Sequence, residues 1–370
     1  MIIKKSITFI LLTLIFTAQK PKDEGLKDIF KESYHIGVAL NSWQLNSTDE
    51  KINSLIANNF NSLSPENGLK WQLVHPELDR YNFEFGDSYV ALGEKIDAFT
   101  IGHCLVWHQQ VPRWVFVDEN NEKLNKAALI SRMEQHIETV AGRYKGKIHG
   151  WDVVNEAFNE DGSFRESDWY KIAGKDFMKA AFRKAHVVDP EAELYYNDYN
   201  VWNAAKRKGI LDFAKEMVAE GIQVDAIGMQ GHYQLDTPTL EQIEQGIIDI
   251  HEAGFKVMVT ELDVDVLPRP RRAVGADLNM NFANSDEYNP YKDGITPEGE
   301  AKLAARYAEI FKIYEKHKDK ITRVTFWGLG DGNSWLNNFP VRGRTNYPLL
   351  FDRKLEPKTD VISKIASVVN

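Results

Sequence analysis

The sequence contains a single cysteine, Cys104, among its 370 residues, so no disulfide can form within the chain. An excess of positive charge is also absent: Lys and Arg number 45 against 54 Asp and Glu, for a formal charge of −9. Nucleic-acid binding needs basic surface to displace counterions, so we expect no nucleic-acid partner. We expect a monomer whose binding partner is uncharged or recognised locally.

Long apolar runs are lacking after residues 1–18. This first segment has a charged start, a short apolar run that ends at Phe16, and Ala18 before a polar stretch. These parts are typical of a secretory signal peptide, whose apolar run is too short for a mature membrane span. We therefore expect cleavage after Ala18 and export to the periplasm or the medium.

The rest of the sequence is typical of a globular protein, with 43% hydrophobic and 27% charged residues overall. Short β-branched or aromatic runs alternate with longer amphipathic ones, which indicates repeated βα units. Eight runs are predicted as strands: 35–41, 59–67, 98–108, 148–157, 192–200, 226–232, 256–264 and 323–331. Eight strands, each followed by a helix, predict an α/β fold of the (β/α)8 type, the TIM barrel. We expect residues 26–370 to form this barrel as a single domain.

Capping residues mark several of the predicted helices. One helix follows Asn125, one follows Thr239 in a capping-box arrangement, and one begins at Thr296 with a proline in its first turn. The first carries an apolar stripe at spacings of three and four: Leu129, Met133, Ile137, Val140 and Tyr144. A last helix is predicted over 359–369.

The segment 266–294 is long for a loop inside a compact domain and is rich in Pro, Asn, Arg and Asp. On the C-terminal face of a barrel, such a loop is more often functional than accidental. Its basic run is interpreted as a solvated surface: Arg269, Arg271 and Arg272. Its acidic residues are interpreted as solvated rather than as calcium ligands: Asp277, Asp286 and Asp293.

Polar and aromatic residues gather at the C-terminal ends of the predicted strands, which in a barrel surround one cavity. Glu156 and Glu261 each follow an apolar run, and a buried carboxylate is costly without a partner or a function. Taken singly, each is as consistent with a structural ion pair as with catalysis. Aromatic rings that could stack on a sugar are expected around the same cavity: Trp71, Trp107, Trp327 and Trp335.

Two opposed carboxyl groups among aromatic rings predict glycoside hydrolysis. One carboxyl must be protonated to help the leaving group depart, and the other must be ionised. The ionised group raises the pKa of its neighbour, and this neighbour then serves as the acid.

Asp263 lies two residues after Glu261 on the same strand face, and His232 ends the neighbouring strand. We expect His232, held by Asp263, to donate to Glu261 and keep it ionised and oriented.

Three histidines near the strand ends lack the spacing of a metal site: His103, His108 and His232. We therefore expect no catalytic metal and no cofactor. Cys104 has apolar neighbours and is interpreted as a buried packing residue rather than a nucleophile.

Motifs at these strand ends, in the right order, closely resemble glycoside hydrolase family 10, the endo-β-1,4-xylanases. They are SPENGLKW, GHCLVWH, WDVVNEA, GMQGH and VTELDV. The resemblance extends from about residue 26 to the C-terminus. It implies that Glu156 is the acid/base and Glu261 the nucleophile, an assignment that the residues alone leave open. It also implies retention of anomeric configuration, with the two carboxyl groups about 5–5.5 Å apart.

The resemblance further implies roles in binding xylan or xylo-oligosaccharides. Asn155 would bind the 2-hydroxyl of the sugar at the cleavage point. The same subsite would be completed by His103, Trp107, Gln230 and His232, with Trp327 and Trp335 over the sugar. The next sugar on the non-reducing side would be held by Glu66, Asn67 and Lys70. The leaving-group side would be contacted by Tyr199 and Asn200.

We therefore predict a secreted endo-β-1,4-xylanase. One alternative is another retaining barrel hydrolase, such as a β-1,4-glucanase or a mixed xylanase/glucanase, which would differ in tolerance of the hydroxymethyl group of glucose. The other is a carbohydrate-binding protein that kept the barrel and lost turnover, although the presence of both glutamates argues against it.

Overall fold

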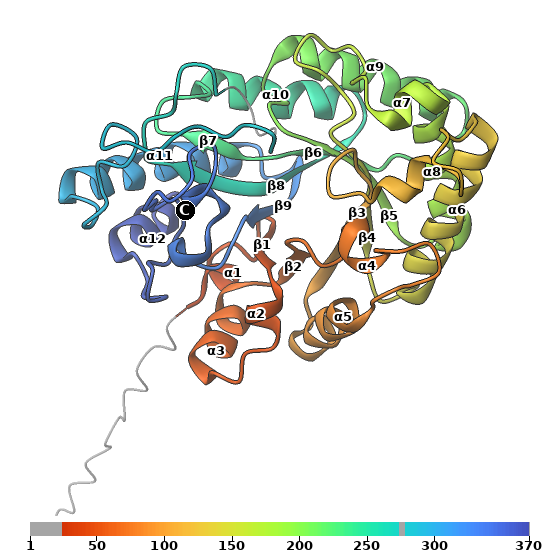
Figure 1. Cartoon of the computed structure of the whole chain (residues 1–370). Helices are drawn as coiled ribbons and strands as arrows, with labels where there is room; N and C mark the ends of the chain where they lie inside the picture. The colour runs from red at the N-terminus through yellow and green to blue at the C-terminus, as the bar shows by residue number, and fades with distance from the viewer. Residues whose placement is uncertain (1–23, 274–277, 370) are drawn as a thin grey trace, which may run out of the picture.

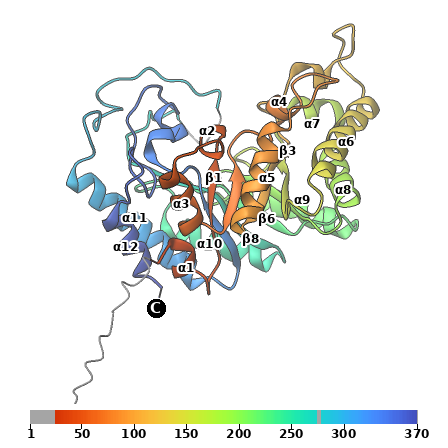
Figure 2. The ribbon, with the colours of Figure 1, turned by 90° about the horizontal axis from the view of Figure 1, so that it is seen from below.

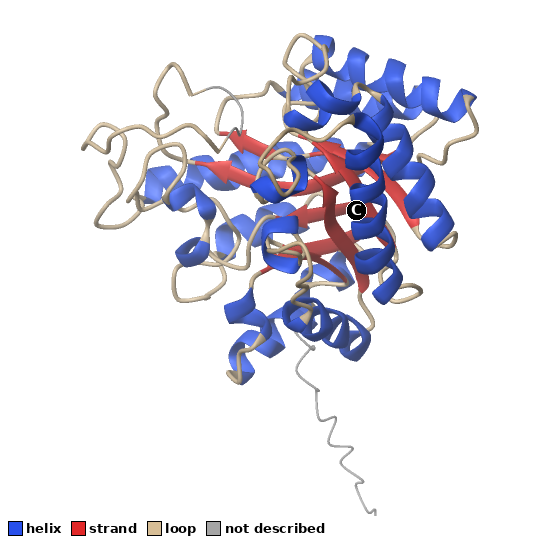
Figure 3. Cartoon of the chain, turned by 45° about the vertical axis from the view of Figure 1, so that its right-hand side comes forward, coloured by secondary structure: helices blue, strands red, loops and turns tan. Residues whose placement is uncertain are grey.

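The computed structural model describes residues 24–273 and 278–369, with strands at the centre and helices around them (Figures 1 and 3). The strands are β1 (His35–Leu40), β2 (Ser62–Pro65), β3 (Phe99–Val106), β4 (Gly150–Asn155), β5 (Glu193–Asp198), β6 (Ala226–Met229), β7 (His232–Gln234), β8 (Lys256–Asp265) and β9 (Ile321–Phe326). The helices are α1 (Leu26–Ile29), α2 (Ser42–Leu45), α3 (Glu50–Asn59), α4 (Trp71–Val74), α5 (Glu84–Ile96), α6 (Lys126–Arg143), α7 (Asp168–Ala173), α8 (Asp176–Val188), α9 (Ala204–Ala219), α10 (Leu240–Glu252), α11 (Pro297–Lys316) and α12 (Thr359–Ala366).

The strands form a closed parallel barrel. Their spatial order is β6-β5-β4-β3-β2-β1-β9-β8, and β6 also pairs with β8, which closes the ring. β7 continues the position of β6 and pairs with the outer half of β8, with His232 opposite Asp263. The barrel therefore has eight strand positions, as the sequence predicts, with one position split between β6 and β7.

Each of the eight predicted strands differs from the structure in its bounds, and two differ in how they end. The strand predicted over 226–232 is split because its register against β8 shifts by one residue, from Met229 opposite Val259 to His232 opposite Asp263. The strand predicted over 323–331 spans Ile321–Phe326 and ends early. Gly328, with a φ of 135°, turns the chain there, a conformation that only glycine adopts readily.

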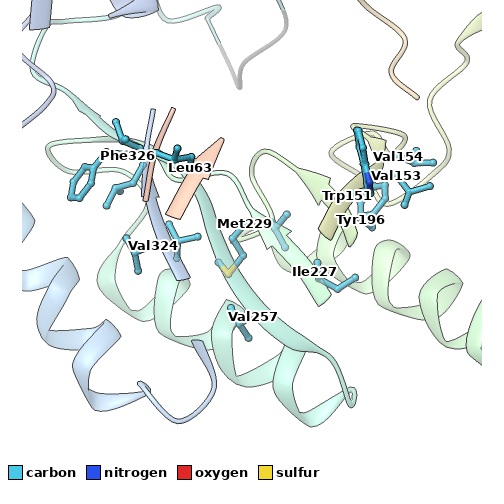
Figure 4. Packing of buried hydrophobic residues seen from close by; sticks show 14 of the residues in the cluster. Leu63, Trp151, Val153, Val154, Tyr196, Ile227, Met229, Val257, Val324 and Phe326 are labelled. Carbon is cyan, nitrogen blue, oxygen red and sulfur yellow. The ribbon is translucent and has the colours of Figure 1, made fainter. Parts of the chain in front are cut away.

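The core has two layers. A small cluster fills the barrel interior: Ile101, Tyr195, Ala226 and Met258. A much larger cluster lies between the sheet and the surrounding helices, where Figure 4 shows Ile227, Met229 and Val257. Because successive strand residues point to opposite faces, Tyr195 belongs to the interior cluster and Tyr196 to the outer one.

The predicted helix starts are confirmed. Asn125 caps α6 through the Ala128 N–H, and Thr239 forms a capping box with Gln242 at the start of α10. Thr296 caps α11. These caps depend on residues three positions apart, so the sequence alone locates them.

The chain between β8 and α11 forms a long loop (Figure 2). This loop is held at its start by the carboxylate of Asp265. Arg269 Nε donates to it at 2.7 Å, Asn346 Nδ2 at 2.6 Å and Arg344 Nη2 at 3.3 Å. The interpretation of Arg269 as solvated is therefore wrong, because its side chain is only 7% exposed and pairs with a buried carboxylate. Its neighbours Arg271 and Arg272 are exposed, as predicted.

Residues 1–18, predicted as a signal peptide, lie outside the described residues. Within 24–273 and 278–369, no helix is both long and apolar enough to cross a membrane.

Candidate active site

A cavity opens at the C-terminal ends of the barrel strands, and most of the predicted site residues line it. Its lining comprises Glu66, Asn67, Lys70, His103, Trp107, Gln110, Asn155, Glu156, Gln230, His232, Glu261, Leu278, Trp327 and Trp335. These residues belong to strand ends or to the loops that follow them. Side chains far apart in the sequence thus meet at the face where barrels carry their chemistry.

Glu156 follows β4 directly and is turned into the cavity by its backbone. In a regular strand, Asn155 and Glu156 would point to opposite faces, yet both line the cavity. The φ of Glu156 is 56°, in the left-handed region, which accounts for the turn. Its carboxyl group accepts hydrogen bonds from Trp107 Nε1 at 2.9 Å, Asn155 Nδ2 at 3.1 Å and Gln230 Nε2 at 3.1 Å.

The environment of Glu156 favours its protonated form. Burial raises the pKa of this carboxyl, and the negative charges of Asp198 and Glu261 raise it further. Hydrogen bonds from Gln230 and Trp107 oppose this rise without cancelling it. Glu156 therefore holds a proton more readily than an ordinary glutamate, as a general acid requires.

Glu261, on β8, has the opposite balance. Burial would raise its pKa, but the hydrogen bond and charge of His232 and the charge of Lys70 bring the pKa below its ordinary value. His232 Nε2 lies 3.1 Å from Glu261 Oε2, and Asn197 Nδ2 donates to Oε1 at 2.8 Å. Glu261 is therefore ionised and fixed in orientation.

His232 joins Glu261 to Asp263, as the sequence suggested. Its Nδ1 lies 3.0 Å from Asp263 Oδ1, and Trp335 Nε1 donates to the other Asp263 oxygen at 2.8 Å. Burial alone would lower the pKa of His232, but the charges of Asp263 and Glu261 raise it to about 9. His232 is thus a cation at neutral pH, and Asp263 lies behind it.

This buried cation predicts a pH dependence of folding stability. The pKa of His232 is about 9 in the folded protein against 6.5 ordinarily, so its contacts stabilise the fold fully below 6.5 and are lost as the pH rises through 9. We expect the free energy of unfolding to fall by up to about 3 kcal/mol across this range. His232→Gln should flatten that slope in urea unfolding measured at several pH values. Identical slopes in the two proteins would contradict the assignment.

Two asparagines link the catalytic candidates. Asn197 Nδ2 donates to Asn155 Oδ1 at 3.0 Å as well as to Glu261, and Asn155 in turn donates to Glu156. The Thr260 hydroxyl donates to Asn197 Oδ1 at 2.6 Å and so fixes the amide orientation. Both glutamates therefore belong to one short network.

A second polar group lines the cavity beside the glutamates. Lys70 Nζ donates to Asn67 Oδ1 at 3.0 Å, and Asn67 Nδ2 donates to Glu66 Oε1 at 3.2 Å. Asn41 donates to the other Glu66 oxygen at 3.1 Å. Lys70 Nζ also lies 4.8 Å from the centre of the Trp107 ring. These groups form a preorganised set of donors and acceptors suited to sugar hydroxyls.

Aromatic rings wall the cavity, with one exception to the prediction. Trp107, Trp327 and Trp335 line it. His103 is held by Asp152, with 2.9 Å between Nδ1 and Oδ2, and its ring meets that of Trp327 edge to face. Trp71 is instead buried and stacks on His136 with 3.7 Å between ring centres. The expectation that Trp71 lines the cavity is wrong, because α4 turns its ring toward α6.

Two predicted contacts of the leaving-group side lie away from the cavity lining. Tyr199 is 6% exposed, and its hydroxyl accepts from Arg165 Nη2 at 2.6 Å. Asn200 Nδ2 donates to Glu160 Oε1 at 3.2 Å. Contact of Tyr199 or Asn200 with substrate therefore stays a prediction.

Several site residues were missed from the sequence. Gln110 and Leu278 line the cavity, and Asn197 and Asp152 hold residues that line it. Asn197 and Asp152 lie within strand-end motifs, where their spacing could have indicated them. Leu278 belongs to the long loop and has no such signal.

The described residues contain no group of three or more His, Cys, Asp or Glu side chains placed to hold a metal ion. Of the acidic loop residues, Asp286 is exposed and pairs with Lys292, and Asp277 lies outside the described residues. Cys104 is 2% exposed and burial raises its pKa, which fits a packing role.

The C-terminal end of this parallel barrel carries two buried glutamates whose pKa values are shifted in opposite directions, in a cavity lined by tryptophans. This is the architecture of a barrel glycoside hydrolase. The model of glycosyl hydrolase family 10 matches residues 25–366. The chain belongs to this family.

Relatives of known name agree with this membership. The chain is 44% identical to endo-1,4-beta-xylanase A of Xylanibacter ruminicola, over 96% of this chain and 97% of the relative. It is 37% identical to endo-1,4-beta-xylanase B of Paenibacillus barcinonensis, over 90% and 95%. Among solved structures, a family 10 endoxylanase from a sugarcane soil metagenome has a TM-score of 0.89 at 44% identity, covering 94% of this chain and 100% of that one.

Proposed function

We propose that the chain is an endo-β-1,4-xylanase that retains anomeric configuration, with Glu156 as the acid/base and Glu261 as the nucleophile. The observation that carries the proposal is the opposed electrostatics of two buried glutamates in one cavity. The pKa of Glu156 is raised and that of Glu261 is lowered. One side chain is thus prepared to give a proton and the other to attack.

The proposed reaction has two steps. Glu261 attacks the anomeric carbon while Glu156 protonates the glycosidic oxygen, so the C–O bond breaks and a glycosyl-enzyme ester forms. Formation of the ester removes the negative charge of Glu261, which lowers the pKa of Glu156. Glu156 then takes a proton from water, whose oxygen attacks the anomeric carbon and releases Glu261.

The choice of xylan as substrate is supported by the names of the relatives, which are xylanases, and by the cavity chemistry. Tryptophan faces suit the apolar faces of pyranose rings, and Asn, Gln and Lys donors suit their hydroxyls. No observation on this chain specifically favours a glucan.

The test is a substrate panel with the wild-type protein. We expect hydrolysis of xylan and of an aryl β-xylobioside, with much lower rates on cellulose and mannan derivatives. Proton NMR during early hydrolysis should show the β-anomer released first. Release of the α-anomer first would overturn retention, and preference for cellulose would make the enzyme a glucanase. No turnover on any of them would leave a carbohydrate-binding protein.

His232 gives a prediction on the pH profile. His232→Gln removes the positive charge that lowers the pKa of Glu261. The acidic limb of kcat/KM should therefore move to higher pH, because Glu261 loses its proton later. His251→Gln, at an exposed position on α10, is the matched control and should leave the profile in place. An unmoved acidic limb in His232→Gln would count against its coupling to Glu261.

Export and a monomeric state are also part of the proposal. The support for export is the charged start and apolar run of residues 1–18. N-terminal sequencing of the protein recovered from the periplasm and the medium should find a start after Ala18. Light scattering of the mature protein should give the mass of one chain.

A further inference from the structure

The peptide group that joins Glu156 to Ala157 is held at both ends. Its carbonyl oxygen, that of Glu156, accepts from Arg165 Nε at 3.0 Å. Its N–H, that of Ala157, donates to the Tyr196 hydroxyl at 2.8 Å. The Glu156 N–H also donates to the Asn197 carbonyl oxygen at 2.9 Å. The backbone on both sides of the Glu156 side chain is therefore fixed.

This fixation coincides with unfavourable backbone geometry. The φ of Glu156 is 56°, a conformation that non-glycine residues adopt only at a cost in free energy. The same conformation turns the carboxyl group into the cavity instead of toward the helices. Contacts that hold the peptide group thus also hold the orientation of the side chain.

Tyr196 contacts the Ala157 N–H from the side of the sheet that faces away from the cavity. It is 1% exposed and lies on the outer face of the sheet, beside Val153 and Val154 of β4 (Figure 4). It is absent from the cavity lining. Tyr196 therefore supports Glu156 without reaching a substrate.

The Tyr196 hydroxyl is oriented by a buried ion pair. It donates to Asp198 Oδ2, two residues further along the same strand face. Asp198 Oδ1 lies 2.8 Å from Lys206 Nζ of α9, and both side chains are fully buried. Because the Tyr196 hydroxyl donates its proton to Asp198, the hydroxyl oxygen is free to accept the hydrogen bond from the Ala157 N–H.

We propose that Tyr196, oriented by the Asp198–Lys206 pair, is a positioning residue that keeps Glu156 in its left-handed conformation and aims its carboxyl at the glycosidic oxygen. The inference rests on the proposed function, because it assigns a support to the proposed acid. None of these three side chains lines the cavity, so they act through Glu156.

Asp198 has a second, electrostatic effect on the same carboxyl. Charged or titratable groups face Glu156 from several elements: Asp198 of β5, Glu261 of β8, Cys104 of β3, Arg165 after β4 and Tyr199 after β5. After burial, the charge of Asp198 is the main cause that raises the pKa of Glu156. Loss of that charge should make Glu156 a stronger acid that gives up its proton at lower pH.

The first experiment is Tyr196→Phe, with Tyr195→Phe as the matched control. Tyr195 is the adjacent buried tyrosine of β5, and its hydroxyl donates to Glu193 at 2.7 Å on the other face of the sheet. We would measure kcat/KM on two substrates, together with the melting temperature. Xylotetraose has a sugar as its leaving group, which needs protonation, whereas 2,4-dinitrophenyl β-xylobioside has an activated phenolate. Tyr196→Phe should lose about tenfold or more on xylotetraose relative to the aryl substrate. Tyr195→Phe should leave the ratio between the substrates unchanged.

Two results would overturn the positioning role. One is Tyr196→Phe within about twofold of wild type on both substrates, since general acid catalysis is worth far more than that. The other is an equal loss on both substrates with an unchanged melting temperature. Failure of the wild-type protein to hydrolyse either substrate would instead refute the proposed function.

The second experiment, Asp198→Asn, separates charge from position. Asparagine keeps an oxygen that can accept from Tyr196, and Lys206 keeps Glu160 at 3.4 Å. The basic limb of kcat/KM should move to lower pH, because that limb reports the acid in the free enzyme. Asp212→Asn, at an exposed position on α9, should leave the limb in place. A basic limb that stays at the wild-type pH in Asp198→Asn would overturn the electrostatic effect.

Discussion

Glu261→Ala is expected to lower kcat by roughly 10⁴-fold or more on every substrate, whatever its leaving group. The proposed glycosyl-enzyme ester cannot form without this carboxylate, and water is too weak a nucleophile to replace it. The fold should persist, because His232 keeps its contact with Asp263. Hydrolysis of xylan and of 2,4-dinitrophenyl β-xylobioside, measured beside a thermal melt, checks both expectations.

Azide provides the control for this variant. With Glu261 removed, azide fits the vacated space and should attack the anomeric carbon of the dinitrophenyl substrate from the same side. The product should be the α-glycosyl azide, which NMR identifies. Turnover of the variant at a wild-type rate, or formation of the β-azide alone, would show that Glu261 is not the nucleophile.

Glu156→Ala is expected to discriminate between leaving groups. Loss of a general acid should lower kcat/KM on xylo-oligosaccharides by about 10²–10⁴-fold. An activated dinitrophenol leaves without protonation, so kcat/KM on the aryl xylobioside should fall far less. The comparison of the two substrates with one enzyme preparation is the measurement.

The azide product again reports the residue's position. Here azide should attack the glycosyl-enzyme from the side where Glu156 stood and give the β-glycosyl azide, opposite to the product expected with Glu261→Ala. Equal losses on both substrates, without azide product, would contradict the acid/base assignment.

Local sequence patterns predicted several helix starts correctly and indicated the main catalytic candidates. The caps at Asn125, Thr239 and Thr296 depend on contacts within one helical turn, so they were predicted correctly. The catalytic candidates were found because apolar runs end at Glu156 and Glu261, and a barrel brings such ends to one mouth. The link from His232 to Asp263 followed from strand periodicity and the pairing of neighbouring strands.

Features that depend on packing between distant segments could not be predicted from local sequence patterns. Trp71 looked like a cavity residue, but the direction of its ring depends on how α4 packs against His136 of α6. Arg269 looked solvated although its partner Asp265 is only four residues away, because the burial of that carboxylate depends on a distant segment that contains Arg344 and Asn346. The split between β6 and β7 depends on a one-residue shift in their register against β8. In each case the deciding contact is tertiary.

The attachment of the loop after β8 has a consequence for engineering. Asp265 ties the beginning of this loop, through Arg269 and the Leu267 N–H, to a segment that contains Arg344 and Asn346. Beyond this fastening, the loop places Leu278 at the rim of the cleft. The later part of the loop is attached to the same segment, because the Phe282 N–H donates to the Pro340 carbonyl oxygen at 3.0 Å and Asn284 Nδ2 donates to that of Gly343 at 3.0 Å. An exchange of this loop with that of another family member should therefore transfer both segments together.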